Sequence, residues 1–180
     1  YKHSPKKEYL NMSLKTVYKD GDTEKYVYEL LDGKYIETVF IKRRGGGTVC
    51  VSTQVGCSVG CIFCESGRNG FVRNLTPAEI VQQVILLRRK VNRIIFMGMG
   101  EPLFNYDNFI KAIHILRDRN GMNFPTDGIT VSTVGPVKQL KKLREEHLKI
   151  QLTISLHATV TIPRQRRFTG YGRTHQARIM

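Results

Sequence analysis

The chain has 180 residues, of which 41% are apolar and 24% are charged. These ordinary globular values exclude intrinsic disorder and collagen-like or low-complexity classes, and no apolar run reaches the roughly 18–20 residues of a membrane-spanning helix. The 29 basic residues outnumber the 15 acidic ones, which gives a net charge of +14. Such an excess favours a polyanion, nucleic acid by default, as the partner; the alternative is a merely soluble basic protein.

The first segment, residues 1–47, is expected to be a β-rich N-terminal extension. It lacks an apolar signal core, so we do not expect secretion, and because it begins without Met we treat the chain as an excised piece. The turn residues Asp32-Gly33 separate two strand-like runs, Tyr28–Leu31 and Tyr35–Ile41, which is typical of a hairpin or meander. The glycine-rich run Lys42–Gly47 predicts a flexible basic loop after it.

Strands and helices alternate from residue 48 onward. The predicted strands are Thr48–Thr53, Arg93–Met97, Ile129–Thr133 and Ile150–Leu156. The predicted helices begin at the capping sequence Thr76-Pro77-Ala78-Glu79 and at Asn108–Arg119 and Val137–His147. This alternation predicts βαβ units and a parallel sheet, either doubly wound or of the barrel type, with the chemistry at the carboxyl ends of the strands.

The last segment, residues 159–180, breaks this rhythm. Between residues 164 and 180 it holds five arginines, no lysine and no acidic residue, and it shows no apolar stripe. We expect it to be disordered or foreign to the fold, with a frameshift or a truncation as the possible cause.

All four cysteines, Cys50, Cys57, Cys61 and Cys64, lie in one short segment. Crowding of this kind, without a signal peptide, indicates metal binding or thiol chemistry in the reducing cytosol. The last three have C-x3-C-x2-C spacing, so one loop can offer three thiolates to a compact metal centre. Iron–sulfur clusters usually take four cysteines, and three would leave one iron open to another ligand. The alternative is a structural zinc site that recruits Cys50 as the fourth ligand.

This cysteine loop, with Phe63 before its last cysteine, resembles the radical S-adenosylmethionine (SAM) superfamily. The segment Gly98–Pro102 supports the resemblance, because glycines let a ligand approach the backbone and Glu101 can hold an ammonium group. Further segments narrow the resemblance to the RlmN and Cfr type of ribosomal RNA adenine methyltransferases. They are Val49–Cys57, Asn74–Thr76, Phe96–Pro102, Val131–Thr133 and Ile154–Ala158.

The resemblance implies an α/β fold, namely an incomplete radical-SAM (β/α) barrel with parallel strands over residues 48–158. Cys57, Cys61 and Cys64 would hold a 4Fe–4S cluster whose open iron binds SAM. The residues that would line SAM are Phe63, Gly100, Glu101, Ser132, Ser155, Leu156 and His157. Cys50 would deprotonate and resolve a covalent RNA adduct, and Glu37 would accept a proton.

Plainer interpretations of these residues stay open on sequence alone. Cys50 could be a buried strand cysteine, Glu37 a surface residue of the meander and His157 a core histidine. Ser132 and Ser155 could be polar strand ends. The basic residues of the third predicted helix are typical of a solvated face, although they could also contact phosphates.

The implied activity is methylation of carbon 2 of an adenosine in 23S rRNA, with tRNA as a further substrate and an electron donor such as flavodoxin as a partner. Methylation of carbon 8, which confers antibiotic resistance, is the close alternative. A radical enzyme acting on protein and a non-catalytic zinc or RNA-binding module are alternatives of other classes. The family's methyl-carrying cysteine belongs to a C-terminal region, and no cysteine follows Cys64 here. The sequence therefore resembles an incomplete member, and it does not indicate an oligomeric state.

Overall fold

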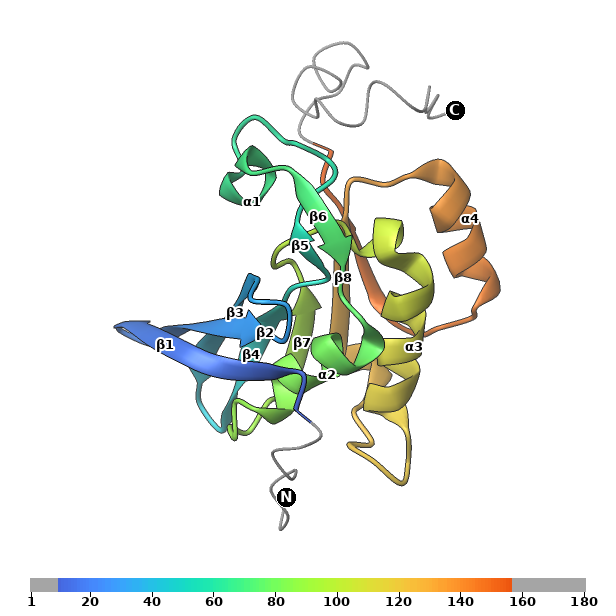
Figure 1. Ribbon diagram of the computed structural model, residues 1–180. Helices are drawn as coiled ribbons and strands as arrows, with labels where there is room; N and C mark the ends of the chain where they lie inside the picture. Colours follow the sequence, from blue (N-terminus) through green and yellow to red (C-terminus); the bar gives the residue numbers. More distant parts are fainter. Residues whose placement is uncertain (1–9, 157–180) are drawn as a thin grey trace.

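A seven-stranded sheet forms the centre of the computed structural model, which describes residues 10–156 (Figure 1). Its strand order is β1-β2-β3-β4-β7-β8-β9. Antiparallel pairing joins β1 (Met12–Asp20), β2 (Thr23–Leu30), β3 (Tyr35–Arg43) and β4 (Gly46–Val51). Parallel pairing joins β4 to β7 (Arg93–Phe96), β8 (Ile129–Thr133) and β9 (Gln151–Ile154). The parallel strands follow one another in chain order, as in a (β/α) barrel, without the reversal of a doubly wound sheet.

The connections between these strands hold the remaining elements. After β4 come β5 (Gln54–Gly56), α1 (Glu65–Arg68) and β6 (Phe71–Asn74), and β5 pairs with β6 in a separate two-stranded sheet. The helix α2 (Pro77–Ile85) then leads to β7. Between β7 and β8 lie the 3₁₀ helix η2 (Pro102–Asn105), α3 (Tyr106–Arg117) and a second 3₁₀ turn, η3 (Thr126–Gly128). The helix α4 (Val137–Glu145) connects β8 to β9.

The two faces of the parallel sheet differ in burial. One face is fully buried and forms the core with residues of α2 and α3; its strand residues are Val49, Val51, Ile94, Phe96, Ile129 and Val131. On the other face, the register aligns Val39 with Cys50, Cys50 with Ile95, and Ile95 with Thr130. This row is only half-buried. We call this side, with Glu37 and Ser132 at positions two residues along the same strands, the open face.

The predicted start of α2 is confirmed by its capping box. The Thr76 hydroxyl accepts a hydrogen bond from the Glu79 amide (3.2 Å), and the Glu79 carboxylate accepts one from the Thr76 amide (2.8 Å). Glu79 also binds Arg73 through both oxygens, at 2.8 and 2.9 Å, and Arg73 reaches Asp32 at 2.7 Å. The helix start is thereby joined to β6 and to the turn between β2 and β3.

The prediction of a flexible loop over Lys42–Gly47 is wrong. The strand β3 extends to Arg43 and β4 begins at Gly46, so only Arg44 and Gly45 form the turn. Gly45 takes a positive φ of 79°, which lets so short a turn close. The sheet is therefore continuous between the N-terminal strands and the parallel strands.

The prediction of an α/β fold with parallel strands after a β-rich segment is confirmed. The division into 1–47, 48–158 and 159–180 stays a prediction, and the last of these segments lies outside the described residues. Within residues 10–156, no helix has the length and apolar character needed to cross a membrane.

Candidate functional site

The predicted site residues gather at the carboxyl ends of the parallel strands. The segment after β4 carries the cysteine loop, the segment after β7 carries Gly100 and Glu101, and β8 and the segment after β9 carry Ser132 and Ser155. In a sheet of this kind the carboxyl ends of neighbouring strands meet at one edge, so these segments share one end of the molecule.

The cysteine loop connects β5 to α1. Its backbone is held by hydrogen bonds from the Cys57 amide to the Gly70 carbonyl (3.0 Å) and from the Cys64 amide to the Cys61 carbonyl (3.1 Å). Cys57 is buried, whereas Cys61 and Cys64 are half-buried, and all three are free thiols. Gly56 lies just before the loop with φ at +73°, where a Cβ would stand 1.9 Å from the Gly70 carbonyl oxygen. Only glycine therefore allows β5 and β6 to approach so closely.

The electrostatics of this loop suit a cationic metal centre. Burial raises the pKa of Cys57, and it raises the pKa of Cys61 to about 12; the negative charges of neighbouring cysteines and Glu101 add to both shifts. Three thiolates would thus repel one another unless a cation joined them. The Ser58 hydroxyl is buried beside them and has no hydrogen-bond partner in the structure.

The donor set therefore fits a metal or cluster, although its sulfur atoms are not yet gathered around one point. Within residues 10–156, no three His, Cys, Asp or Glu side chains form a group that could hold a metal ion.

The glycines after β7 pack against the segment after β4. A Cβ at Gly98 would lie 2.7 Å from the Val51 carbonyl, and one at Gly100, where φ is +96°, would lie 2.6 Å from Cβ of Gln54. The Met99 amide donates to the Ser52 hydroxyl (2.9 Å), and the Met99 carbonyl accepts from the Thr53 amide (2.8 Å). These glycines are thus required for internal packing, independently of any ligand.

Glu101 is buried, with 3% of its surface exposed. Its carboxylate accepts hydrogen bonds from the Thr133 hydroxyl (2.5 Å), the Val134 amide (2.9 Å) and the Leu103 amide (3.0 Å). Burial raises the pKa of Glu101, and these hydrogen bonds oppose that shift. A carboxylate has about four acceptor positions, and these three bonds occupy three of them.

Cys50 and Glu37 lie on the open face, on the neighbouring strands β4 and β3, and Glu37 is two residues from Val39, the register partner of Cys50. Burial raises the pKa of the Cys50 thiol, and a hydrogen bond with the backbone of Met97 opposes this. The Glu37 carboxylate is half-exposed and pairs with Lys25 at 2.9 Å, as an ordinary surface residue of a meander would.

The remaining predicted residues differ in their surroundings. The hydroxyl oxygens of Ser132 and Ser155 are 3.3 Å apart, so these two side chains do meet. Phe63 and Leu156 are largely exposed. His157 lies outside the described residues.

Sequence reasoning missed Gln83 and the structural role of Ser52 and Thr133, which lie within the segments that carried the resemblance; these three buried polar residues hold the site together. The Ser52 hydroxyl donates to the Glu37 carbonyl (2.6 Å) and accepts from the Met99 amide, so it joins β3 to the loop after β7. The Gln83 side chain binds both the amide (2.7 Å) and the carbonyl (2.9 Å) of Ser52. A glutamine within a helix carries no sequence signal for such a role.

Comparison with known proteins matches residues 51–179 to the radical SAM superfamily. A probable RNA methyltransferase of Rhodopseudomonas palustris (strain BisB5) is 59% identical over 150 residues, which are 83% of this chain and 42% of that protein. A probable dual-specificity RNA methyltransferase RlmN of Dictyoglomus thermophilum is 46% identical over 161 residues, 84% of this chain and 46% of that protein.

A solved structure has the same fold. The crystal structure of a radical SAM methyltransferase from Sphaerobacter thermophilus superposes with a TM-score of 0.84 and 38% identity, over 88% of this chain and 49% of that one. The resemblance to RlmN-type methyltransferases inferred from the motifs is confirmed. The chain spans less than half of the length of these relatives.

Proposed function

This chain belongs to the radical SAM superfamily, and from that premise we propose that it supplies the radical SAM domain of an RNA methyltransferase of the RlmN type. The proposed reaction is methylation of carbon 2 of an adenosine in 23S rRNA, with tRNA as a further substrate. Relatives named as dual-specificity RNA methyltransferases RlmN support carbon 2 over the carbon 8 alternative.

One observation carries this proposal. The three-cysteine loop lies at the carboxyl ends of the parallel strands, and Cys50 lies near the carboxyl end of β4, on the open face. The loop offers three thiols and the buried Ser58 hydroxyl, which suits a 4Fe–4S cluster with one iron left for SAM. Cys50 is on a rigid strand, bound to β3 on one side and β7 on the other. A nucleophile and a cofactor loop thus have fixed supports within one sheet.

The cluster and SAM, when bound, would supply the one-electron chemistry that an unreactive methyl C–H bond requires. The protein's own residues would then position SAM and the adenosine and would transfer protons. Gly100, Glu101, Ser132 and Ser155 would offer backbone and hydroxyl groups to SAM, with Phe63 and Leu156 providing apolar contact and His157 a further polar group. The Cys50 thiolate would take the ring proton and, after passing that proton to Glu37, would attack the carrier sulfur. A disulfide would form as the carbon–sulfur bond of the adduct breaks, and the freed carbon would keep the electron pair and take up a proton, which releases the product.

The raised pKa of Cys50 has a consequence for this role. Because burial favours the neutral thiol, the thiolate must be produced in the complex, by transfer of its proton to an acceptor or by the approach of a positive charge. Glu37 shares the open face and is the acidic side chain for which the resemblance implies proton transfer. Its ion pair with Lys25 would have to open first.

Partners and location follow from the same premise. We propose an RNA substrate, a one-electron donor such as flavodoxin, and a cytoplasmic location. The basic net charge of +14 agrees with an RNA substrate.

Anaerobic reconstitution with iron and sulfide tests the proposal. The chain should bind about four irons and turn brown. Replacing Cys57, Cys61 or Cys64 with Ala should abolish iron retention, while Cys50→Ala, the matched control, should retain it.

The opposite results would contradict the proposal. Zinc retained without iron or sulfide would indicate a structural zinc module. A requirement for Cys50 in metal retention would indicate a four-cysteine site, because the open iron would then be lost.

A further inference from the structure

Two basic triplets lie at the end of the sheet opposite the candidate site. Lys42-Arg43-Arg44 forms the end of β3 and its turn, and Arg88-Arg89-Lys90 lies between α2 and β7. All six side chains are exposed. We call these six residues the basic edge. They flank the amino ends of β4 and β7, whereas the cysteine loop follows the carboxyl end of β4.

Hydrogen bonds from Asn92 hold the segments that carry the two triplets together. The Asn92 amide donates to the Gly47 carbonyl (2.8 Å), and the Asn92 side chain donates to the Gly45 carbonyl (3.3 Å). Gly46 has a φ of +156°, a backbone conformation that side-chain-bearing residues rarely adopt, and a Cβ there would stand 2.4 Å from the Asn92 side chain. The proximity of the two basic segments is therefore fixed by the fold.

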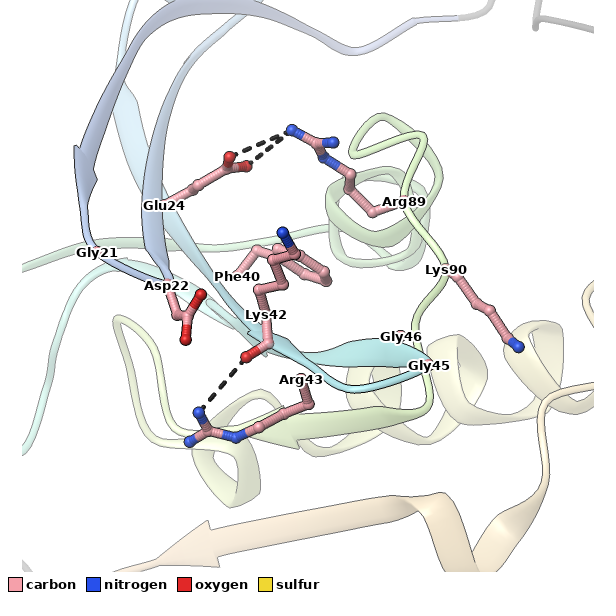
Figure 2. A pocket seen from close by; sticks show the side chains of 10 residues that line it. All are labelled: Gly21, Asp22, Glu24, Phe40, Lys42, Arg43, Gly45, Gly46, Arg89 and Lys90. Atoms are coloured by element: carbon pink, nitrogen blue, oxygen red, sulfur yellow. Dashed lines mark hydrogen bonds and ion pairs between the residues drawn. The ribbon is translucent and has the colours of Figure 1, made fainter.

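A hollow of about 490 Å³ opens between the triplets (Figure 2). Lys42, Arg43, Arg89 and Lys90 line it, together with two acidic residues, Asp22 and Glu24. Its volume is within the range of small-ligand sites. Figure 2 shows Glu24 turned toward Arg89.

The acidic residues do not neutralise the hollow. Both Glu24 oxygens bind Arg89 at 3.2 Å, and Lys19 lies 3.6 Å from one of them, so its charge is already matched. Among the described residues, no carboxylate lies within ion-pair distance of Lys42, Arg43 or Lys90. Lys42, Arg43 and Lys90 line the hollow without a carboxylate partner, and Asp22 is the one other acidic residue of its lining.

Like charges held together repel one another, and a bound polyanion removes that repulsion while it releases counterions. We propose that the basic edge binds phosphate groups of the RNA backbone, at a distance from the reacting adenosine. This inference rests on the proposed function for its choice of RNA as the polyanion. The six cations occupy a broad exposed edge around an open hollow, which suits successive phosphates of a strand better than one enclosed ion.

The distance between the basic edge and the candidate site is short enough for one RNA molecule to reach both. The strand β4 has six residues, which at about 3.3 Å each separates its ends by about 20 Å. RNA-binding modules that recognise shape span about 16 base pairs, which is considerably longer. One structured RNA can thus place a nucleotide at the open face while its backbone reaches the basic edge.

The test compares two triple variants that remove the same charge. K42Q/R43Q/K90Q removes two lysines and one arginine from the basic edge, and K138Q/K141Q/R144Q removes the same residue types from the exposed surface of α4. Binding of a fluorescent RNA stem-loop of about 16 base pairs is measured by anisotropy across a series of salt concentrations. Circular dichroism checks that both variants fold.

We expect the basic-edge variant to weaken binding about a hundredfold at moderate salt and to lower the salt slope by about two, since each lost phosphate contact removes about 0.7–0.9. The α4 variant should change the slope by less than one. The conservative variant K42R/K90R should keep the wild-type slope, because it retains the charge.

Three outcomes would overturn the inference. Equal losses in both triple variants would mean that only net charge matters, and a larger loss in the α4 variant would place the RNA on α4. If the wild-type chain bound inorganic phosphate and the basic-edge variant did not, while both bound RNA equally well, the basic edge would be a small-anion site. If the unaltered chain bound no RNA even at low salt, the RNA substrate of the proposed function would fail as well, whereas the first three results leave it standing.

Discussion

The hydrogen bond between Thr133 and Glu101 is the residue-scale feature on which the geometry of the cofactor-side loops most depends. Glu101 belongs to the loop after β7, and Thr133 ends β8, so the bond spans two neighbouring strand ends. Both residues are buried. A carboxylate in such a place needs every donor it has, because a buried charge without partners is strongly unfavourable.

Thr133→Val should therefore destabilise the fold. It keeps the shape of the side chain but removes a hydrogen bond to a charged group, and we expect a loss of about 1.5–3 kcal/mol in the free energy of unfolding. Urea unfolding measures this. Thr130→Val is the control, because Thr130 lies on the same strand and its hydroxyl binds exposed Gln151; its effect should stay within about 0.5 kcal/mol.

The effect of Thr133→Val should also depend on pH. Burial raises the folded-state pKa of Glu101, so the folded state holds this proton more tightly than the unfolded chain does. Its contribution to stability is then largest below the unfolded pKa and declines as pH rises through the folded value. Removing a donor to the carboxylate raises that pKa further, so the loss should be larger at neutral pH than in mild acid. A loss that is equal at both pH values would contradict this.

At the scale of elements, α2 is joined to the sheet by one buried polar side chain. Gln83 accepts hydrogen bonds from the Ser52 amide and the Thr38 hydroxyl (2.9 Å), and it donates to the Ser52 carbonyl. Because Ser52 in turn holds Met99 and the backbone of Glu37, the helix indirectly fixes both the loop after β7 and the strand that carries Glu37.

Gln83→Leu should leave both backbone groups of Ser52 without partners. The buried Thr38 hydroxyl loses its partner as well. With three unsatisfied groups at about 1–3 kcal/mol each, we expect a loss of about 3 kcal/mol or more, measured by urea unfolding. Gln82→Leu on the same helix is the control. Gln82 is only partly buried and binds the Asn11 amide near the first strand, so its replacement should cost about 1 kcal/mol or less.

The elements themselves could be predicted where a local signal exists. Alternating apolar residues predicted β8 with its observed bounds, and the Thr76–Glu79 capping sequence predicted the start of α2. The glycine run at 45–47 was misjudged, because glycine signals a loop locally while here it serves a tight turn and close packing against Phe40.

The site could be predicted only in part, for a related reason. Its cysteines and glycines form contiguous motifs, so their spacing alone pointed to one edge of the sheet. Ser52, Gln83 and Thr133 have partners between 15 and 47 positions away. Contacts between residues so far apart in the sequence form only once the chain has folded, and the local sequence does not predict them.

For the whole molecule, we predict that a polypeptide of this 180-residue sequence methylates no RNA and cleaves SAM slowly at best. The proposed chemistry needs one thiol to carry the methyl group and another to release the product. Beyond the three cysteines of the cluster loop, only Cys50 is present, and one sulfur cannot attack itself. Reduced, reconstituted protein is incubated with labelled SAM and unmodified 23S rRNA. Methylated adenine above a no-enzyme control would refute this account of the thiols.

The continuous pairing of β3 with β4 has a consequence for the order in which the sheet is built. The strands β1 to β4 are joined by short turns, so their pairing closes only small loops, whereas β7 must find β4 across the whole segment that contains the cysteine loop and α2. Loop closure slows as the separation of the partners grows. We therefore expect the meander to form first and to present the edge of β4, to which each later parallel strand adds.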